Sequence, residues 1–157
     1  MSAGAGSGVT TPQGFAAAGL AAGLKASGKP DLAVVRNLGP AYAAAGVFTS
    51  NRIVAAPVQW SNDILDGTLQ AVVLNSGGAN ACTGAPGYAD AREMAELTAG
   101  ALGCDATEVA VCSTGLIGVR LPMDRLREGI PAAAAALGEG GGTAAATAIM
   151  TTDSVSK

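Results

Sequence analysis

The sequence contains no histidine, which excludes two large classes of catalytic site within its 157 residues. Without an imidazole the chain forms neither a Ser-His-Asp nor a Cys-His arrangement, and it lacks the commonest protein ligand of transition metals. The three cysteines, Cys82, Cys104 and Cys112, include no C-x-x-C pair, which argues against a zinc site. We therefore expect no metal and no cofactor, and we interpret the cysteines as small, reduced, buried side chains.

Aromatic residues, basic clusters and long hydrophobic runs are also scarce. Aromatics make up 3% of the chain and the net charge is −3, which argues against a nucleic-acid partner. No apolar stretch approaches the roughly 20 residues that span a bilayer, so we expect no membrane contact. Residues 1–8 lack the basic start and apolar core of a signal peptide. We expect a flexible leader over 1–8, a single domain over 9–157 and a cytoplasmic location.

Small residues are abundant, with 23 glycines and many alanines, and they favour closely packed layers. Short apolar runs bounded by turn residues predict five strands, over Gly14–Lys25, Asp31–Val35, Ala44–Thr49, Leu69–Leu74 and Glu108–Cys112. Helical periodicity and end signals predict four helices, over Ala55–Leu65, Tyr88–Leu102, Pro122–Leu137 and Thr143–Met150. Pro131 either kinks the third helix or divides it. Interleaved strands and helices indicate a layered α/β (α+β) sheet-and-helix sandwich.

The first candidate site is the segment Asn75–Asn80, which follows the strand predicted to end at Leu74. It lacks the lysine of a P-loop and the glycine spacing of a dinucleotide-binding turn, so it is a poor nucleotide site. Gly77 and Gly78 permit positive φ or a close approach to another segment, and Asn75 and Asn80 can tie down a turn. The residues alone leave two interpretations of this segment open: a structural turn, or part of an active site.

The second candidate site is Cys112–Gly118, where a strand brings hydroxyl groups and a glycine to its carboxyl end. Sites of α/β proteins commonly form there, and consecutive backbone N–H groups can make an oxyanion hole. Ser113 is an improbable nucleophile, because the chain has no histidine to activate it and no G-x-S-x-G elbow. The third candidate, Ile149–Asp153, is either a plain turn or a set of hydroxyls that bind a polar substrate.

Taken together, the three segments resemble one family. N-S-G-G-A-N-A-C-T-G, V-C-S-T-G-L-I-G-x-x-L-P-M and A-I-M-T-T-D, in this order, are similar to the bifunctional ornithine acetyltransferase (glutamate N-acetyltransferase) family. The upstream G-F-x-A-A-G-x-A-A-G-x-K-x-S-G and A-A-G-V-F-T-x-N are similar to its N-terminal half. The resemblance runs from Val9 to Lys157.

The resemblance implies a precursor that cleaves itself before an internal threonine to give α and β chains. That threonine is the nucleophile, which takes acetyl from N2-acetyl-L-ornithine and passes it to L-glutamate in arginine biosynthesis; some members also use acetyl-CoA. It implies that Thr114 and Gly115 form the oxyanion hole and that Thr151 contacts substrate. An N-terminal threonine uses its own amino group as base, so the absence of histidine fits.

The resemblance also implies that the nucleophile lies beyond Lys157, in a β chain that would be the partner of this one in a heterotetramer of two α and two β chains. We therefore expect the 157-residue chain alone to be inactive. Two alternatives stay open at this stage. One is a self-cleaving amidase or aminopeptidase of similar architecture, and the other is a non-catalytic module whose glycine-rich loops bind an anion. We expect Asn75–Asn80 to lie beside Thr114 as a supporting turn.

Overall fold

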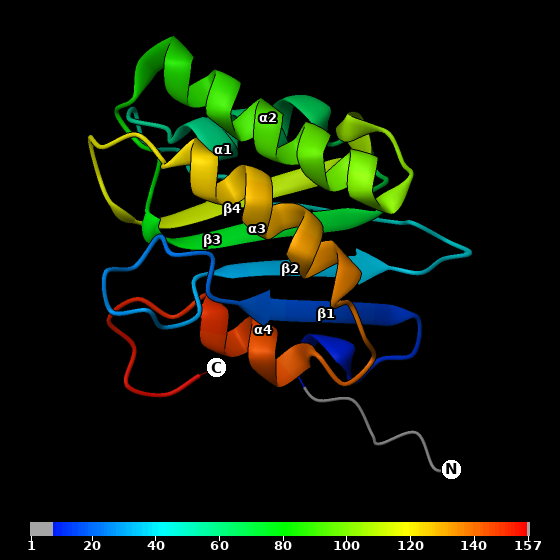
Figure 1. The fold of residues 1–157 in the computed structure, drawn as a ribbon. Coiled ribbons are helices and arrows are strands. Elements are labelled where there is room, and N and C mark those ends of the chain that lie inside the picture. Colours follow the sequence, from blue (N-terminus) through cyan, green and yellow to red (C-terminus); the bar gives the residue numbers. More distant parts are fainter. Residues whose placement is uncertain (1–7, 157) are drawn as a thin grey trace.

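A mixed four-stranded sheet forms the centre of the computed structural model, which describes residues 8–156 (Figure 1). The strand order is β1-β2-β3-β4; the first three strands run antiparallel, and β3 and β4 run parallel. The strands are β1 (Phe15–Leu20), β2 (Leu32–Asn37), β3 (Ala71–Gly78) and β4 (Val109–Leu116). Most of the expected leader lies outside the described residues; its last residue, Gly8, begins the short 3₁₀ helix η1 (Gly8–Thr10).

Helices cover both faces of this sheet, which confirms the layered sheet-and-helix fold (Figure 1). Three helices lie on one face, and the short α4 lies on the other face, over β1 and β2. The helices are α1 (Ala56–Ile64), α2 (Gly84–Leu102), α3 (Met123–Ala135) and α4 (Gly142–Ala148), with the 3₁₀ helix η2 (Ala106–Glu108) before β4. No helix within residues 8–156 is long and apolar enough to cross a membrane.

The core is built from small and aliphatic side chains. On the face of α2 and α3, Met94, Leu126 and Ile130 are fully buried against the valines of the sheet. On the opposite face the buried hydrophobic side chains between α4 and the strands are alanines, with Val35 and Leu74 packed against them, and a Cβ added to Gly19 would lie 2.1 Å from the carbonyl oxygen of Ala144. The close packing expected from the composition is therefore confirmed.

Helix α1 covers part of the outer edge of β4. Trp60 donates its indole N–H to the carbonyl of Val109 at 3.0 Å. The Ser61 hydroxyl both donates to the Val111 carbonyl and accepts from the Val111 N–H, each at 2.9 Å. These side chains satisfy backbone groups that an unpaired edge strand otherwise leaves open. Beyond Val111, the edge of β4 is exposed at Thr114.

Most predicted elements are confirmed, with corrections. The strand predicted over Gly14–Lys25 ends at Leu20, and the strand predicted over Glu108–Cys112 continues through Leu116. The strand predicted over Ala44–Thr49 is wrong, since only an isolated bridge forms nearby, between Ala43 and Thr68. The strand predicted to end at Leu74 continues through Gly78, so four of the six residues of the expected turn are strand. The helix predicted from Tyr88 begins four residues earlier. Helix α3 continues through Pro131 and is not divided there.

Candidate functional site

Two of the three sequence segments lie side by side at the carboxyl ends of the parallel strands. In the register of β3 and β4, Ser76 pairs with Thr114 and Gly77 pairs with Gly115. Parallel strands present their carboxyl ends at the same edge of a sheet, where side chains from both can act together. The expectation that Asn75–Asn80 lies beside Thr114 is therefore confirmed, although the neighbouring part is a paired strand and not a turn.

The glycines of the two segments let the backbones approach closely. Gly77 has φ of +120° and Gly115 has φ of +134°, a region that residues with side chains rarely adopt. A Cβ on Gly115 would lie 2.6 Å from the carbonyl carbon of Gly77 and 2.6 Å from the amide nitrogen of Gly78. Both motifs therefore need glycine at this point for the strand ends to keep their geometry.

Asn75 joins the two strand ends through its side chain. It is 1% exposed, and its amide nitrogen donates to the Gly78 carbonyl at 3.0 Å. Its amide oxygen accepts from the Ser113 hydroxyl at 2.6 Å. This bond uses the Ser113 proton in a structural contact with a neutral amide, which is no general base. The interpretation of Ser113 as an improbable nucleophile agrees with this geometry.

Asn80 organises the turn between β3 and α2. It is fully buried, with φ of +48°, and its amide nitrogen donates to the Gly87 carbonyl at 2.8 Å. Its amide oxygen accepts from the Thr83 hydroxyl at 2.7 Å, and its backbone carbonyl accepts from the N–H of Ala56 at 3.0 Å. Asparagine tolerates this left-handed conformation better than most residues. Its contacts give Asn80 a supporting role.

Thr114 differs from these buried neighbours. Its side chain is exposed, and its hydroxyl makes no hydrogen bond within residues 8–156. The adjoining Gly115 is exposed as well. A hydroxyl and a glycine exposed at a strand end are the kinds of group that can donate to the oxygen of a bound molecule.

Thr151 reaches the same end of the sheet by way of α4. The Ser76 hydroxyl donates to the carbonyl of Ala148, the last residue of α4, and Ser76 is the register partner of Thr114. Thr151 follows three residues later and is exposed. The segment after α4 and the loop after β4 both lie at the left end of the sheet in Figure 1. All three sequence segments therefore converge on one end of the molecule.

The expectation that the cysteines are buried is wrong for two of the three. Cys82 is exposed in the turn before α2, with φ of +58°, and Cys112 is exposed on β4. Cys112 lines an open cavity of about 380 Å³ between β4, α1 and the segment 45–49, so solvent reaches a side chain that protein surrounds. Burial raises the pKa of the Cys112 thiol. Cys104 is half-buried, and burial raises its pKa too.

Sequence reasoning missed a second set of polar residues near this end of the sheet. Asp31 is fully buried and accepts hydrogen bonds from the backbone of the loop after β1. Asp90, 3% exposed on α2, accepts from the guanidinium of Arg120, with Nε at 2.9 Å, and this pair ties down the loop after β4. The hydrogen bond to Asp90 raises the pKa of Arg120. No group of three potential ligands is placed to hold a metal in the described range.

The fold with its paired strand ends is similar to that of solved proteins of the ornithine acetyltransferase type. The structure of an ornithine acetyltransferase complexed with ornithine, from Mycobacterium tuberculosis, is 59% identical and has a TM-score of 0.93, covering 94% of this chain and 81% of that one. The arginine biosynthesis bifunctional protein argJ of Bacillus halodurans is 39% identical with a TM-score of 0.86, covering 95% of this chain and 78% of that one.

The chain belongs to the ArgJ family, whose model matches residues 16–157. It is 62% identical, over 95% of its length, to the "Arginine biosynthesis bifunctional protein ArgJ" of Streptomyces coelicolor. The protein of the same name from Mycobacterium tuberculosis is 59% identical over 96% of this chain. The chain spans 39% of the length of each of these curated relatives. The family resemblance of the sequence motifs is thus confirmed.

Proposed function

We propose that this chain is the α-chain part of a glutamate N-acetyltransferase that moves acetyl from N2-acetyl-L-ornithine to L-glutamate in arginine biosynthesis. The observation that carries the proposal is the register of β3 with β4, which pairs the N-S-G-G segment with the S-T-G-L segment and its exposed Thr114. The name of the similar solved protein, an ornithine acetyltransferase complexed with ornithine, supports the substrate class. A cytoplasmic location and a single domain over 9–157 are part of the proposal.

The reaction proceeds in two acyl transfers. A threonine hydroxyl at the start of the β chain, deprotonated by its own amino group, attacks the acetyl carbonyl of N2-acetyl-L-ornithine. The C–N bond breaks, ornithine leaves with the proton, and acetyl remains as an ester on the threonine. The amino group of glutamate then attacks this ester, and the threonine hydroxyl is restored. No histidine is required at either step.

Thr114 and Gly115 stabilise the negative oxygen that develops in both tetrahedral intermediates. They project from a strand end whose backbone is fixed by pairing and by the buried Asn75, so the donors do not reorganise during the reaction. Loss of one such donor costs about 3 kcal/mol of transition-state stabilisation. Thr151, held at the same end of the molecule, contacts the substrate in the ground state.

Chain lengths support a precursor that is divided into two chains. The present chain covers 81% of the solved Mycobacterium tuberculosis chain but 39% of the curated relative from that organism. The solved chain is therefore about half as long as the curated one. This ratio is what cleavage near the middle of a precursor gives.

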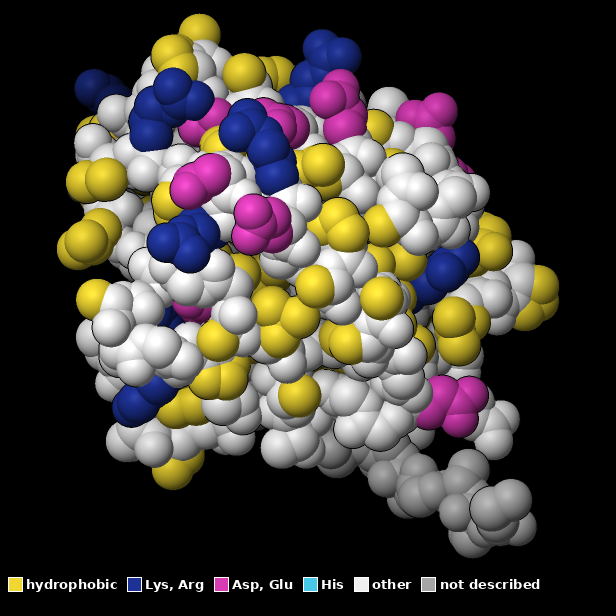
Figure 2. All heavy atoms as spheres, viewed as in Figure 1, with side chains coloured by type: hydrophobic (Ala, Val, Ile, Leu, Met, Phe, Trp, Pro, Cys, Tyr) yellow, Lys and Arg dark blue, Asp and Glu magenta, His cyan; other side chains and the backbone are white. Residues whose placement is uncertain are grey.

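Exposed hydrophobic side chains support a partner that covers the site end of the sheet. Leu116 and Ile117 are each 68% exposed and Val119 is 57% exposed, all directly after Thr114 and Gly115. Figure 2 shows hydrophobic side chains at the left margin, where the loop after β4 lies. Contiguous exposed apolar groups mark interaction sites. We propose the β chain as this partner, in a heterotetramer of two α and two β chains.

The test uses the complete protein that carries this chain. Intact-mass analysis is expected to find two polypeptides, the second beginning with threonine, and labelled acetyl from N2-acetyl-L-ornithine is expected to appear on glutamate. Release of free acetate with no transfer to glutamate would favour the amidase alternative. A single uncleaved polypeptide with no acyl chemistry would favour the anion-binding alternative. The isolated 157-residue chain is expected to be inactive.

A further inference from the structure

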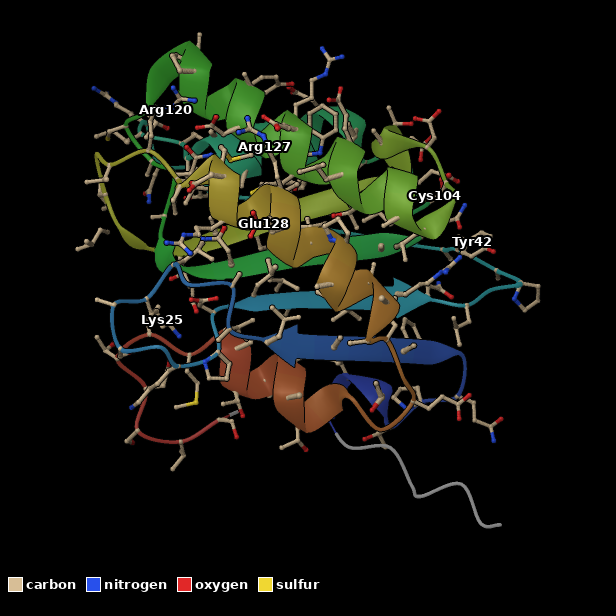
Figure 3. The ribbon with its side chains drawn as sticks, in the orientation of Figure 1. Lys25, Tyr42, Cys104, Arg120, Arg127 and Glu128 are labelled. Atoms are coloured by element: carbon tan, nitrogen blue, oxygen red, sulfur yellow. The ribbon has the colours of Figure 1, made fainter. Side chains whose placement is uncertain are left out.

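Lys25 belongs to the upstream G-x-K-x-S-G motif, and the proposed reaction gives this motif no role. Its Nζ donates to the Met150 carbonyl at 2.6 Å and to the Pro30 carbonyl at 2.8 Å. Figure 3 shows Lys25 in the loop that follows β1, beside the segment that follows α4. One half-buried ammonium thus joins two segments that are 125 residues apart in the sequence. Burial lowers the pKa of Lys25, and the negative charge of Asp31 partly offsets this.

The carbonyl that Lys25 holds belongs to the peptide unit that leads into Thr151. The N–H of this same peptide unit, on Thr151, donates to Asp153 Oδ2 at 3.2 Å. A peptide unit is planar, and its C=O and N–H point in opposite directions. Contacts at both ends therefore restrict the rotation of this plane, which places the Cα of Thr151 and limits the directions open to its side chain.

Lys25 is itself aimed by a buried carboxylate. Asp31 accepts the N–H groups of Ala22 and Leu24, each at 2.7 Å, and that of Lys25 at 2.9 Å. Three hydrogen bonds to a fully buried carboxylate restrain this loop strongly, because charged acceptors make the stronger hydrogen bonds. The loop therefore holds the Lys25 backbone in one place, and the ammonium reaches Met150 from a rigid base.

The same loop touches the strand end of the candidate site. A Cβ added to Gly77 would lie 3.3 Å from the carbonyl oxygen of Leu24, so the residue before Lys25 packs directly on β3. Gly77 is the register partner of Gly115. The loop that carries Lys25 therefore contacts Gly77 on β3 through Leu24 and the segment before Thr151 through the Lys25 ammonium.

We propose that Lys25 is a positioning residue: it holds the Met150–Thr151 peptide so that Thr151 faces the substrate, an inference that rests on the proposed function. Thr151 lies on an exposed segment after a short helix, and Lys25 is the cation that anchors this segment to the loop after β1. Cations near a helix C-terminus also bind free carbonyls for stability alone. The experiment therefore has to separate positioning from stabilisation.

The test compares Lys25→Met with Lys29→Met in the complete enzyme. Lys29 lies in the same loop and is exposed, so its replacement removes the same charge without removing the contact to Met150. Lys25→Met is expected to raise KM for N2-acetyl-L-ornithine about tenfold while kcat changes less than about threefold, since a ground-state contact is lost. Lys29→Met is expected to leave KM unchanged. Lys25→Arg, which keeps donors and charge, is expected to recover part of the loss.

A double-mutant cycle with Thr151→Ala shows whether Lys25 acts through Thr151. If it does, the double variant Lys25→Met/Thr151→Ala has a KM within about twofold of that of Thr151→Ala alone. A KM equal to the product of the two single effects overturns the proposal. Unchanged KM in folded Lys25→Met overturns it as well. If Lys25→Met does not fold, the shorter and neutral Lys25→Gln carries the test, and wild-type KM in that folded variant overturns the proposal.

A readout independent of activity separates this inference from the proposed function. Amide hydrogen exchange at Thr151 is expected to accelerate in Lys25→Met and not in Lys29→Met, because the peptide plane is released. Wild-type protein that transfers no acetyl refutes the proposed function. Active wild-type protein with equal exchange at Thr151 in both lysine variants refutes the Lys25 inference alone.

Discussion

Replacing Gly115 by alanine tests whether the close approach of β3 and β4 shapes the candidate site. The added methyl group would meet the backbone of Gly77 and Gly78 at 2.6 Å, and backbone cannot move aside as a flexible side chain can. A residue with a side chain at φ of +134° adds conformational strain of about 1–2 kcal/mol. Overpacking of a tight contact adds about 1–3 kcal/mol. We expect Gly115→Ala to lower the free energy of unfolding by about 2–5 kcal/mol.

Two other glycines separate these contributions. Gly118 has φ of +83° with nothing within 4 Å of its added Cβ, so Gly118→Ala should cost only the conformational strain, about 1–2 kcal/mol. Gly100, exposed inside α2, has open space and ordinary helical φ, so Gly100→Ala should stabilise by about 0.5–1 kcal/mol. From most to least stable, the expected order is Gly100→Ala, wild type, Gly118→Ala and Gly115→Ala.

Urea denaturation of the chain, followed by the fluorescence of its single tryptophan, measures these differences. Trp60 is 7% exposed, packs edge-to-face on Tyr88 and donates to Val109 of β4, so its emission reports on the sheet. If Gly115→Ala is destabilised no more than Gly118→Ala, the steric reasoning is refuted. In that case the approach of the two strand ends is not what requires glycine.

Three further outcomes are expected. In the complete enzyme, Thr114→Ala should lower kcat about 100-fold and change KM little, because an oxyanion donor acts on the transition state. Steady-state kinetics that show a larger change in KM than in kcat would contradict this. Asn75→Ala should lower the free energy of unfolding by about 1–3 kcal/mol in urea denaturation, since it leaves Ser113 and Gly78 without their partner. Alkylation of Cys112 should be slow near pH 8 and rise as the pH passes 9, since a raised pKa reduces the thiolate at lower pH; a rate already saturated at pH 8, measured by mass spectrometry, would contradict the raised pKa.

The elements with strong local signals could be predicted from the sequence. Three elements begin or end close to their expected positions: helix α1, which contains Pro57, the end of α2 before Gly103, and the start of β4 before Cys112. Gly103 adopts φ of +73° and its N–H donates to the Ala99 carbonyl, the helix stop that a glycine at this position indicates. Local residue chemistry was sufficient in these places.

The errors arose where distant contacts decide the local conformation. Asparagine, serine and glycine are rare in strands, yet Asn75–Gly78 is strand because β4 pairs with it and the Asp31 carbonyl accepts the N–H of Ser76. The reverse holds for Ala44–Thr49, where the apolar run has no partner strand and Val47 is 100% exposed. Helix α2 begins at Gly84, and the buried Asn80, which lies outside the helix, donates to the carbonyl of Gly87 in its first turn.

In the candidate site, too, the sequence indicated which segments matter but not how they contact one another. The motifs identified the segments, but nothing local to Ser76 indicates that this residue joins them. Its N–H donates to Asp31, its hydroxyl donates to Ala148, and its register partner is Thr114. Ser76 is fully buried, so both hydrogen bonds lie inside the protein, where each unpaired polar group is costly. Asp31 and the end of α4 therefore have to meet β3 in one arrangement, because a shift of either leaves the buried N–H or hydroxyl of Ser76 unsatisfied, and the register of β3 with β4 places Thr114 beside them.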